Sequence, residues 1–312
     1  MKTINLGQNK TPVPAIIQGT MRFDTMSAKE VAGMFDNALE NGTNFIDTAN
    51  CYGKPEGLVE SIIGKTFEEN PGLRDKLILQ SKGGITFYED GRPYHNYSKE
   101  HLLKTLDHSL SRMKTDYLDY FLLHRVDALF CPEEVAEAFE TMKKQGKVLH
   151  FGVSNDVPYG IELLQKYCPV PIEVNQMQFG IAHADMCVQP IATNNHEFYA
   201  VDRDCGILNY CRLKDITIQA WSPFQHGFID GTFIDNPDYQ EVNDAMQKIA
   251  DKYGVTKTTI AVAWILRHPA GMQVVCGTTK KERFNDCCKA CDIELTYEDW
   301  YNIYLAAGYP IM

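Results

Sequence analysis

Short apolar runs of strand length recur along the chain, and amphipathic stretches of helical length separate them. The apolar runs predict eight strands, at residues 15–20, 44–48, 77–82, 117–123, 149–153, 171–175, 216–220 and 273–276. Strands that alternate with helices form parallel βαβ units, because each parallel connection needs a long crossover. The pattern therefore predicts an α/β protein in which residues 1–312 form a single (β/α)8 TIM barrel domain.

Four of the intervening stretches carry clear helix signals. In residues 27–40 the apolar positions have helical spacing, and Ser27 with Glu30 has the spacing of a capping box. Three more helices are predicted at residues 132–145, 239–253 and 257–268. The first of these starts with Pro132, a residue that suits the first turn of a helix.

Three connectors are long for a compact barrel. They lie at residues 83–97, 177–199 and 224–238, after the third, sixth and seventh strands. Loops of this length are usually functional or mobile, and in a barrel these would lie over the C-terminal mouth. A doubly wound sheet is the alternative fold, but it would place a glycine-rich dinucleotide fingerprint after the first strand. The chain has Gly19-Thr20-Met21-Arg22 there, which is not that fingerprint.

Composition and charge narrow the possible classes of protein further. The chain has 44% hydrophobic residues and a formal net charge of −11, so it is a poor candidate for nucleic-acid binding, which needs a basic surface. No apolar stretch has the length of a membrane span, and the N-terminus lacks the features of a signal peptide. We therefore expect no membrane association and a cytoplasmic protein whose ten cysteines are reduced.

Metal binding is not expected either. The cysteines lack the paired spacing of zinc sites, and His183, His196 and His226 in the long connectors match no ligand pattern.

Four polar residues at or near predicted strand ends suggest the chemistry. Asp47 and Lys82 close the second and third strands, Tyr52 follows Asp47 by five positions, and His124 follows the fourth strand. Barrel enzymes carry their chemistry at these ends. A tyrosine beside a lysine ammonium becomes more acidic, a carboxylate orients that lysine, and a histidine can steer a carbonyl. Each residue alone has an ordinary structural explanation, but the combination favours proton donation to a carbonyl oxygen.

In their order and context these four residues resemble the catalytic tetrad of the aldo-keto reductases, and the resemblance to bacterial oxidoreductases of that family covers nearly the whole chain. The resemblance implies NADPH-dependent reduction of aldehydes or ketones to alcohols, an activity of the alcohol dehydrogenase type. Hydride would pass from nicotinamide C4 to the carbonyl carbon, with Tyr52 as proton donor. Lys82 and Asp47 would tune Tyr52, and His124 would orient the carbonyl.

The same resemblance implies a cofactor site at the other strand ends. Ser154, Asn155 and Gln176 would hold the nicotinamide carboxamide, Trp221 would stack on the nicotinamide ring, and Ser222 would face the pyrophosphate. The remaining expected contacts are Thr20, Met21, Pro223, Gly277, Thr278, Thr279, Lys280 and Arg283.

The predicted phosphate site follows the eighth strand. Thr279 and Glu282 have capping-box spacing, which predicts a helix that starts near Lys280 and a phosphate site at its N-terminus. Arg283 matches the family arginine that binds the 2′-phosphate, whereas Gly277 and Cys287 replace a common lysine and asparagine. NADPH is therefore the expected cofactor, Lys280 would supply the missing charge, and NADH is the alternative.

The substrate is expected to be a small carbonyl compound. Candidate wall residues are Phe23, Tyr88, Arg125 and Phe228, together with Phe87 and Phe179, which suit an apolar or aromatic molecule. Met21 and Arg125 stand where the family often has tryptophan. Arg125 either binds a carboxylate or phosphate of the substrate or pairs with Asp127 or another acidic neighbour. A short C-terminal tail would leave the pocket open, and a monomer or weak homo-oligomer is expected.

Two other functions remain as alternatives. Some barrels of the family that this chain resembles, the potassium-channel β subunits, act mainly through partners, so a cofactor-sensing or partner-binding regulatory subunit with little turnover is one alternative. A glycoside-processing barrel is the other, but it would need two carboxylates at the mouth, and only Asp47 is a clear candidate.

Overall fold

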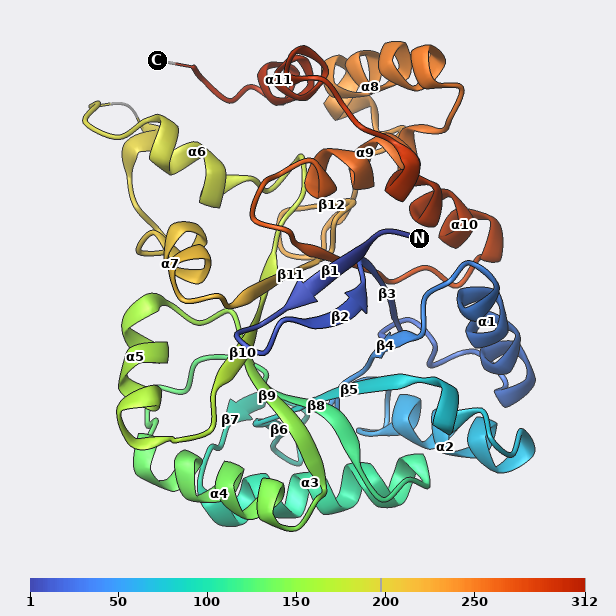
Figure 1. Ribbon diagram of the computed structural model, residues 1–312, viewed down its shortest axis with the longest axis vertical. Helices are drawn as coiled ribbons and strands as arrows, with labels where there is room; N and C mark the ends of the chain where they lie inside the picture. Colours follow the sequence, from blue (N-terminus) through green and yellow to red (C-terminus); the bar gives the residue numbers. More distant parts are fainter. Residues whose placement is uncertain (197, 312) are drawn as a thin grey trace.

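The computed structural model describes residues 1–196 and 198–311, and its centre is a closed barrel of eight parallel strands (Figure 1). Around the barrel the strands are β3 (Ile16–Gly19), β4 (Phe45–Asp47), β5 (Ile78–Gly83), β8 (Leu118–Leu123), β9 (Val148–Ser154), β10 (Ile172–Gln178), β11 (Thr217–Trp221) and β14 (Gln273–Cys276). Each overlaps one predicted strand. The α/β barrel prediction is therefore confirmed, and β14 pairs with β3 to close the sheet.

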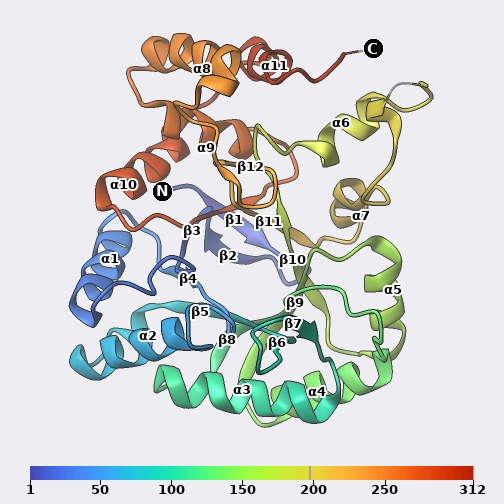
Figure 2. The same ribbon diagram turned by 180° about the vertical axis from the view of Figure 1, so that it is seen from behind.

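Helices surround the barrel, as Figures 1 and 2 show from opposite sides. They are α1 (Ala28–Glu40), α2 (Leu58–Glu69), α3 (Lys99–Met113), α4 (Pro132–Lys144), α5 (Pro158–Tyr167), α6 (Asp185–Ile191), α7 (Ile207–Leu213), α8 (Gln240–Tyr253), α9 (Lys257–Leu266), α10 (Lys281–Lys289) and α11 (Tyr297–Ala306). The four predicted helices are present as α1, α4, α8 and α9. The predicted capping box of α1 forms, since Ser27 and Glu30 bond reciprocally.

Three small hairpins were not predicted. Strands β1 (Thr3–Leu6) and β2 (Thr11–Pro14) cross the barrel at the centre of Figure 1, and the side-chain amide of Gln273 donates to the Pro14 carbonyl from inside the barrel. On the opposite side lie β6 (Ile85–Phe87) with β7 (Pro93–His95), and β12 (Gln225–His226) with β13 (Gly231–Thr232), both visible in Figure 2. The long connectors after the third and seventh barrel strands thus contain short sheets.

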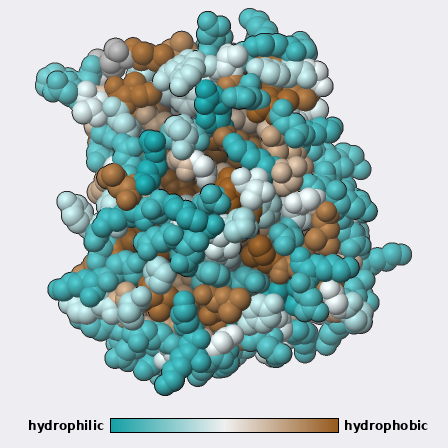
Figure 3. Space-filling model, in the orientation of Figure 1, coloured by the Kyte–Doolittle hydropathy of each residue, from teal (hydrophilic) through white to brown (hydrophobic). Residues whose placement is uncertain are grey.

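The face that carries the N-terminal hairpin is mostly hydrophilic, and its hydrophobic residues appear in separate groups (Figure 3). In the described part of the chain, no helix is long and apolar enough to cross a membrane.

Helices α2 and α3 approach each other closely at Gly64, and a substitution there tests whether this approach depends on a glycine. A Cβ atom at Gly64 would lie 1.9 Å from the backbone oxygen of Arg112. We expect Gly64→Ala to lower the free energy of unfolding by about 1–3 kcal/mol or more, because backbone atoms must move to admit the methyl group. Urea or guanidinium unfolding measures this change.

Gly33 in α1 is the matched control. A Cβ atom there would meet only the end of the flexible Lys281 side chain, at 3.2 Å. Gly33→Ala should therefore keep or slightly raise stability, by up to about 1 kcal/mol, because alanine is the better helix former. Equal stability of the two variants would show that the α2–α3 approach does not depend on a glycine.

Candidate active site

The Lys82 ammonium lies at the centre of the predicted tetrad. Its Nζ atom is 2.7 and 2.8 Å from the two carboxylate oxygens of Asp47 and donates to the Thr48 carbonyl at 2.9 Å. The same atom is 3.4 Å from the Tyr52 hydroxyl oxygen. Lys82 and Asp47 are buried, so their charges depend on each other for compensation. The structure thus brings together three residues from two neighbouring strand ends and the loop that follows β4.

His124 completes this group from the end of β8. Its ring centre is 5.8 Å from that of Tyr52, and its Nδ1 is 3.4 Å from the Cys51 sulfur. Burial, reinforced by Lys82 and Arg125, holds the pKa of His124 well below its usual value, so the imidazole is neutral. Burial also raises the pKa of the Cys51 thiol to about 12. A protonated thiol can donate to Nδ1, and the imidazole proton then resides on Nε2.

The acidity of Tyr52 differs from the prediction. Burial raises the pKa of Tyr52 well above its usual value; Asp47 adds to this rise, and Arg125 opposes it. The sequence predicted a lower pKa because of the neighbouring lysine. The physical reason for the difference is that Asp47 neutralises Lys82 at close range, so desolvation of the phenolate dominates. Tyr52 therefore holds its proton firmly in this structure.

A row of buried glutamines supports Asp47 from inside the barrel. The amide nitrogens of Gln80 and Gln176 donate to Asp47 Oδ1 at 2.7 and 3.0 Å. The same two nitrogens also contact Gln219 Oε1, and Gln219 donates to Gln273 at 2.9 Å. A TIM-barrel interior is usually filled by branched apolar side chains, so this row was not foreseen. It connects the Asp47 carboxylate to the bottom of the barrel and satisfies its remaining lone pairs.

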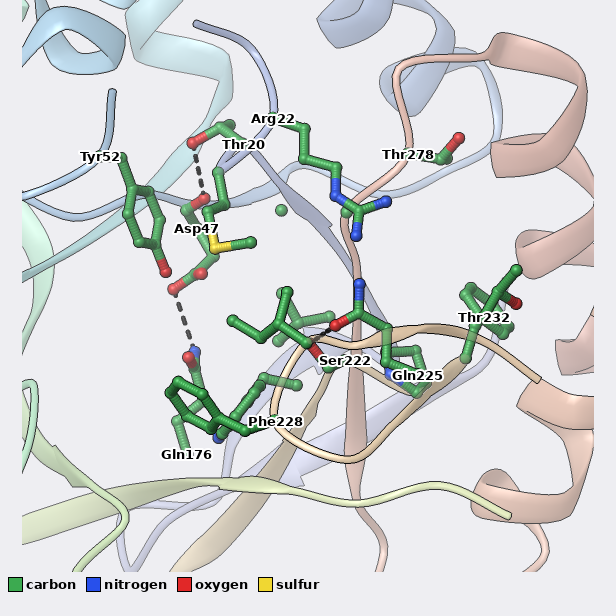
Figure 4. A pocket seen from close by; sticks show the side chains of 18 of the residues that line it. Thr20, Arg22, Asp47, Tyr52, Gln176, Ser222, Gln225, Phe228, Thr232 and Thr278 are labelled. Carbon is green, nitrogen blue, oxygen red and sulfur yellow. Dashed lines mark hydrogen bonds between the residues drawn. The ribbon is translucent and has the colours of Figure 1, made fainter. Parts of the chain in front are cut away.

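A cavity of about 520 Å³ opens above these residues, at the C-terminal ends of the barrel strands (Figure 4). Asp47, Tyr52 and His124 line one part of it, and Lys82 is buried beneath them. The cavity continues past Trp221 to Thr278 and Arg283 at the start of α10. It is therefore an elongated space that joins the tetrad to the end of β14.

Most of the residues expected to contact the cofactor line this cavity. They are Thr20, Met21, Ser154, Asn155, Gln176, Trp221, Ser222, Pro223, Gly277, Thr278 and Arg283. Several also bond one another: Asn155 donates to Ser154 Oγ at 2.7 Å, and the Trp221 indole N–H donates to Asn155 Oδ1 at 3.0 Å. These bonds hold the Trp221 ring in place at the cavity wall.

The beginning of α10 differs from the prediction in detail. The helix starts at Lys281, close to the expected position, but Thr279 and Glu282 form no capping box and Lys280 occupies the N-cap. Instead, Thr278 Oγ1 accepts from the Lys280 backbone N–H at 3.2 Å. Thr279 and Lys280 are exposed and lie outside the cavity lining.

The expected substrate-wall residues divide into two groups. Arg125 and Phe228 line the cavity, with Phe228 exposed over Trp221. Phe23 and Tyr88 lie outside the lining. The Phe23 ring is in the core against Phe35, and the Tyr88 ring packs against Tyr94 in the β6–β7 hairpin. Phe179 is also in the core, and Phe87 lies outside the lining. The sequence places these rings in connectors at the mouth of the barrel, but it does not show in which direction each side chain points.

Several lining residues were not singled out from the sequence. Arg22 follows the first barrel strand, and the others come mainly from the connector after β11; they include Phe224, Gln225, Ile229, Thr232, Ile234 and Asp235. The length of that connector was the available signal. Among the described residues, no group of three or more His, Cys, Asp or Glu side chains is arranged to hold a metal ion.

The chain is similar to known oxidoreductases over most of its length. A model described as the Aldo/keto reductase family matches residues 15–304. The chain is 31% identical to an uncharacterized oxidoreductase, YcsN, of Bacillus subtilis, with 95% of both chains covered. It is 30% identical to a 6-dehydroglucose reductase of Novosphingobium aromaticivorans, with 97% of this chain and 94% of the relative covered.

A solved structure supports the same conclusion for the fold. The crystal structure of a thermostable aldo-keto reductase with the inhibitor epalrestat matches with a TM-score of 0.76 and 24% identity, covering 98% of this chain and 100% of that one. The protein belongs to the aldo/keto reductase family and is an oxidoreductase.

Proposed function

We propose that this protein reduces aldehydes or ketones to alcohols with NADPH. The observation that carries the proposal is the position of the Tyr52 hydroxyl, which faces the cavity and lies 3.4 Å from the buried Lys82 ammonium. Tyr52 donates a proton to the carbonyl oxygen, and the lysine stabilises the charge that forms on the tyrosine oxygen. The neutral His124 donates a hydrogen bond that orients the carbonyl. A family relative named as a 6-dehydroglucose reductase supports a carbonyl substrate.

The cavity extends from the tetrad to the start of α10, and its polar groups suit the two ends of a dinucleotide. Ser154, Asn155 and Gln176 would hold the nicotinamide end, and Trp221, fixed by Asn155, would cover one face of the ring. At the far end, the first backbone N–H groups of α10 have no side-chain cap, and Arg283 lines the cavity beside them. NADPH supplies the hydride when bound.

The direct test is loss of NADPH absorbance with a panel of aldehydes, ketones and quinones. Turnover with carbonyl compounds, saturable in both substrates, would support the proposal. Tight NADPH binding without turnover on any carbonyl would contradict it and favour a cofactor-sensing or partner-binding subunit. An absence of NADPH binding would contradict the cofactor assignment as well.

Preference for NADPH is expected to depend on Arg283. We expect Arg283→Ala to weaken NADPH binding by about 10- to 100-fold, because one charge-assisted contact to the 2′-phosphate is lost. NADH lacks that phosphate, so its dissociation constant should hardly change. Cofactor titration by intrinsic fluorescence measures both constants, and Lys281→Ala, which removes an exposed cation of the same helix, is the control. A parallel loss for NADH would show that Arg283 acts on the fold of the site and not on the phosphate.

A further inference from the structure

The Arg125 guanidinium is a cation inside the cavity, close to the proposed reaction centre. Arg125 follows His124 directly and lines the same cavity as Tyr52. Its guanidinium carbon lies 5.4 Å from the ring centres of both Trp221 and Phe228. These two rings meet edge to face at 6.5 Å, so they form an aromatic corner under the cation.

This guanidinium has no carboxylate partner among the described residues. Asp127, the partner that the sequence suggested, uses its Oδ1 to accept the Leu129 backbone N–H at 2.9 Å. The hydrogen bonds of Arg125 are made by its main chain: its N–H donates to the Tyr97 hydroxyl oxygen at 2.8 Å, and its carbonyl accepts from the same hydroxyl. Tyr97 therefore fixes the backbone, and within residues 1–196 and 198–311 the N–H groups of the guanidinium have no hydrogen-bond partner.

An unpaired cation at a half-buried position is costly, and an anion is its natural compensation. Burial lowers the pKa of Arg125 and outweighs the opposing effects of Tyr52, Tyr97 and Cys51. The guanidinium has five N–H donors in one plane, which match the oxygens of a carboxylate or phosphate. The protein as a whole carries a formal net charge of −11, which repels anions, so a small anionic molecule needs a local cation to be retained.

We propose that Arg125 forms an anion subsite of the active site, and that the substrate is a small carbonyl compound with a carboxylate or phosphate group a few bonds from its C=O. This inference rests on the proposed reductase function. An oxyanion bound at Arg125 places the rest of the molecule between the aromatic corner and the tetrad. The carbonyl is thereby oriented toward Tyr52 and His124.

Paired substrates test the subsite. We would measure kcat/KM with NADPH for 4-carboxybenzaldehyde against 4-nitrobenzaldehyde, and for glyceraldehyde 3-phosphate against glyceraldehyde. Arg125→Leu should lower the ratio of anionic to neutral substrate by about 10- to 100-fold, because a charge-assisted hydrogen bond is lost. Arg125→Lys should keep part of the ratio. The pair with the larger change identifies the preferred oxyanion.

The control variant replaces an arginine that lies near the mouth of the barrel but does not line the cavity. Arg92 lies in the β6–β7 connector, pairs with Asp90 and is exposed. Arg92→Leu changes the net charge by the same amount, so the substrate ratio should stay at the wild-type value. An equal fall in both variants, or no fall in Arg125→Leu, would overturn the subsite.

A binding measurement separates this inference from the reductase proposal. Benzoate and inorganic phosphate would be titrated against the fluorescence of Trp221, since Trp264 and Trp300 stack on each other elsewhere, at 4.7 Å. A saturable change that Arg125→Leu abolishes supports the subsite, even if no carbonyl compound is turned over. If carbonyl compounds are reduced but neither anion binds at Arg125, the reductase proposal stands and the subsite is wrong.

Discussion

Replacing Tyr52 with phenylalanine is expected to lower kcat for carbonyl reduction by about 10²- to 10⁴-fold, the usual contribution of a positioned proton donor. The phenylalanine ring keeps the contact with His124, at 5.8 Å between ring centres, and removes only the hydroxyl that lies 3.4 Å from Lys82. The affinity for NADPH should remain close to that of the wild type. Steady-state kinetics and cofactor titration on the same preparation separate the two effects.

The control for this variant is Tyr88→Phe. Tyr88 is 52% exposed and lies in the β6–β7 connector, outside the cavity lining, so loss of its hydroxyl should leave kcat unaltered. Wild-type turnover by Tyr52→Phe would mean that another group donates the proton. A loss of NADPH affinity equal to the loss of kcat would instead indicate a distorted site.

Replacing Lys82 with methionine should be the most destabilising of the changes considered for the tetrad. Lys82 is fully buried, and its ammonium is the close cationic partner of the buried Asp47 carboxylate. Removal of one partner of a buried ion pair leaves an uncompensated charge, which costs about 3–5 kcal/mol of the free energy of unfolding. The amide donors of Gln80 and Gln176 reduce this cost but do not neutralise the charge. Denaturant unfolding at neutral pH measures the change.

Two further variants make this result interpretable. The double variant Asp47→Asn with Lys82→Met removes both charges and should recover part of the stability. Lys10→Met breaks the exposed pair with Asp215, whose side chains are about half exposed, and should cost at most about 1 kcal/mol. If Lys82→Met were as mild as Lys10→Met, the pair would not contribute to stability through its burial.

Much of the fold and of the site could be predicted from local patterns. The eight strands were visible as apolar runs, and barrel topology then required their C-terminal ends to meet at one mouth. For this reason Asp47, Lys82 and His124 could be grouped although they lie far apart in the sequence. Tyr52 could be added to this group because it follows Asp47 at the strand end by only five positions and must therefore lie near the mouth of the barrel.

Side-chain direction limited the substrate predictions. Phe23 and Tyr88 both lie in connectors at the correct end of the barrel, yet Phe23 packs inward against Phe35 and Tyr88 packs against Tyr94 in its own hairpin. The capping box at Thr279 failed for a related reason, since Thr278 makes the local hydrogen bond there. Spacing along the chain indicates which residues are near an element, and packing decides which way they point.

The periodicity of the apolar positions and the topology of a barrel were enough to predict the fold and the order of the strand ends, because both are properties of the chain. How the residues at those ends affect one another depends on the folded structure. Burial raises the pKa of Tyr52, whereas the sequence predicted a lowered pKa. Packing places the side chains of the barrel glutamines against Asp47. Packing also leaves the Arg125 guanidinium beside Trp221 and Phe228, with no carboxylate partner in the part of the chain that the structure describes. The cost of desolvating a charged group, and whether that group has a partner, depend on the residues that surround it. These residues come from distant parts of the chain.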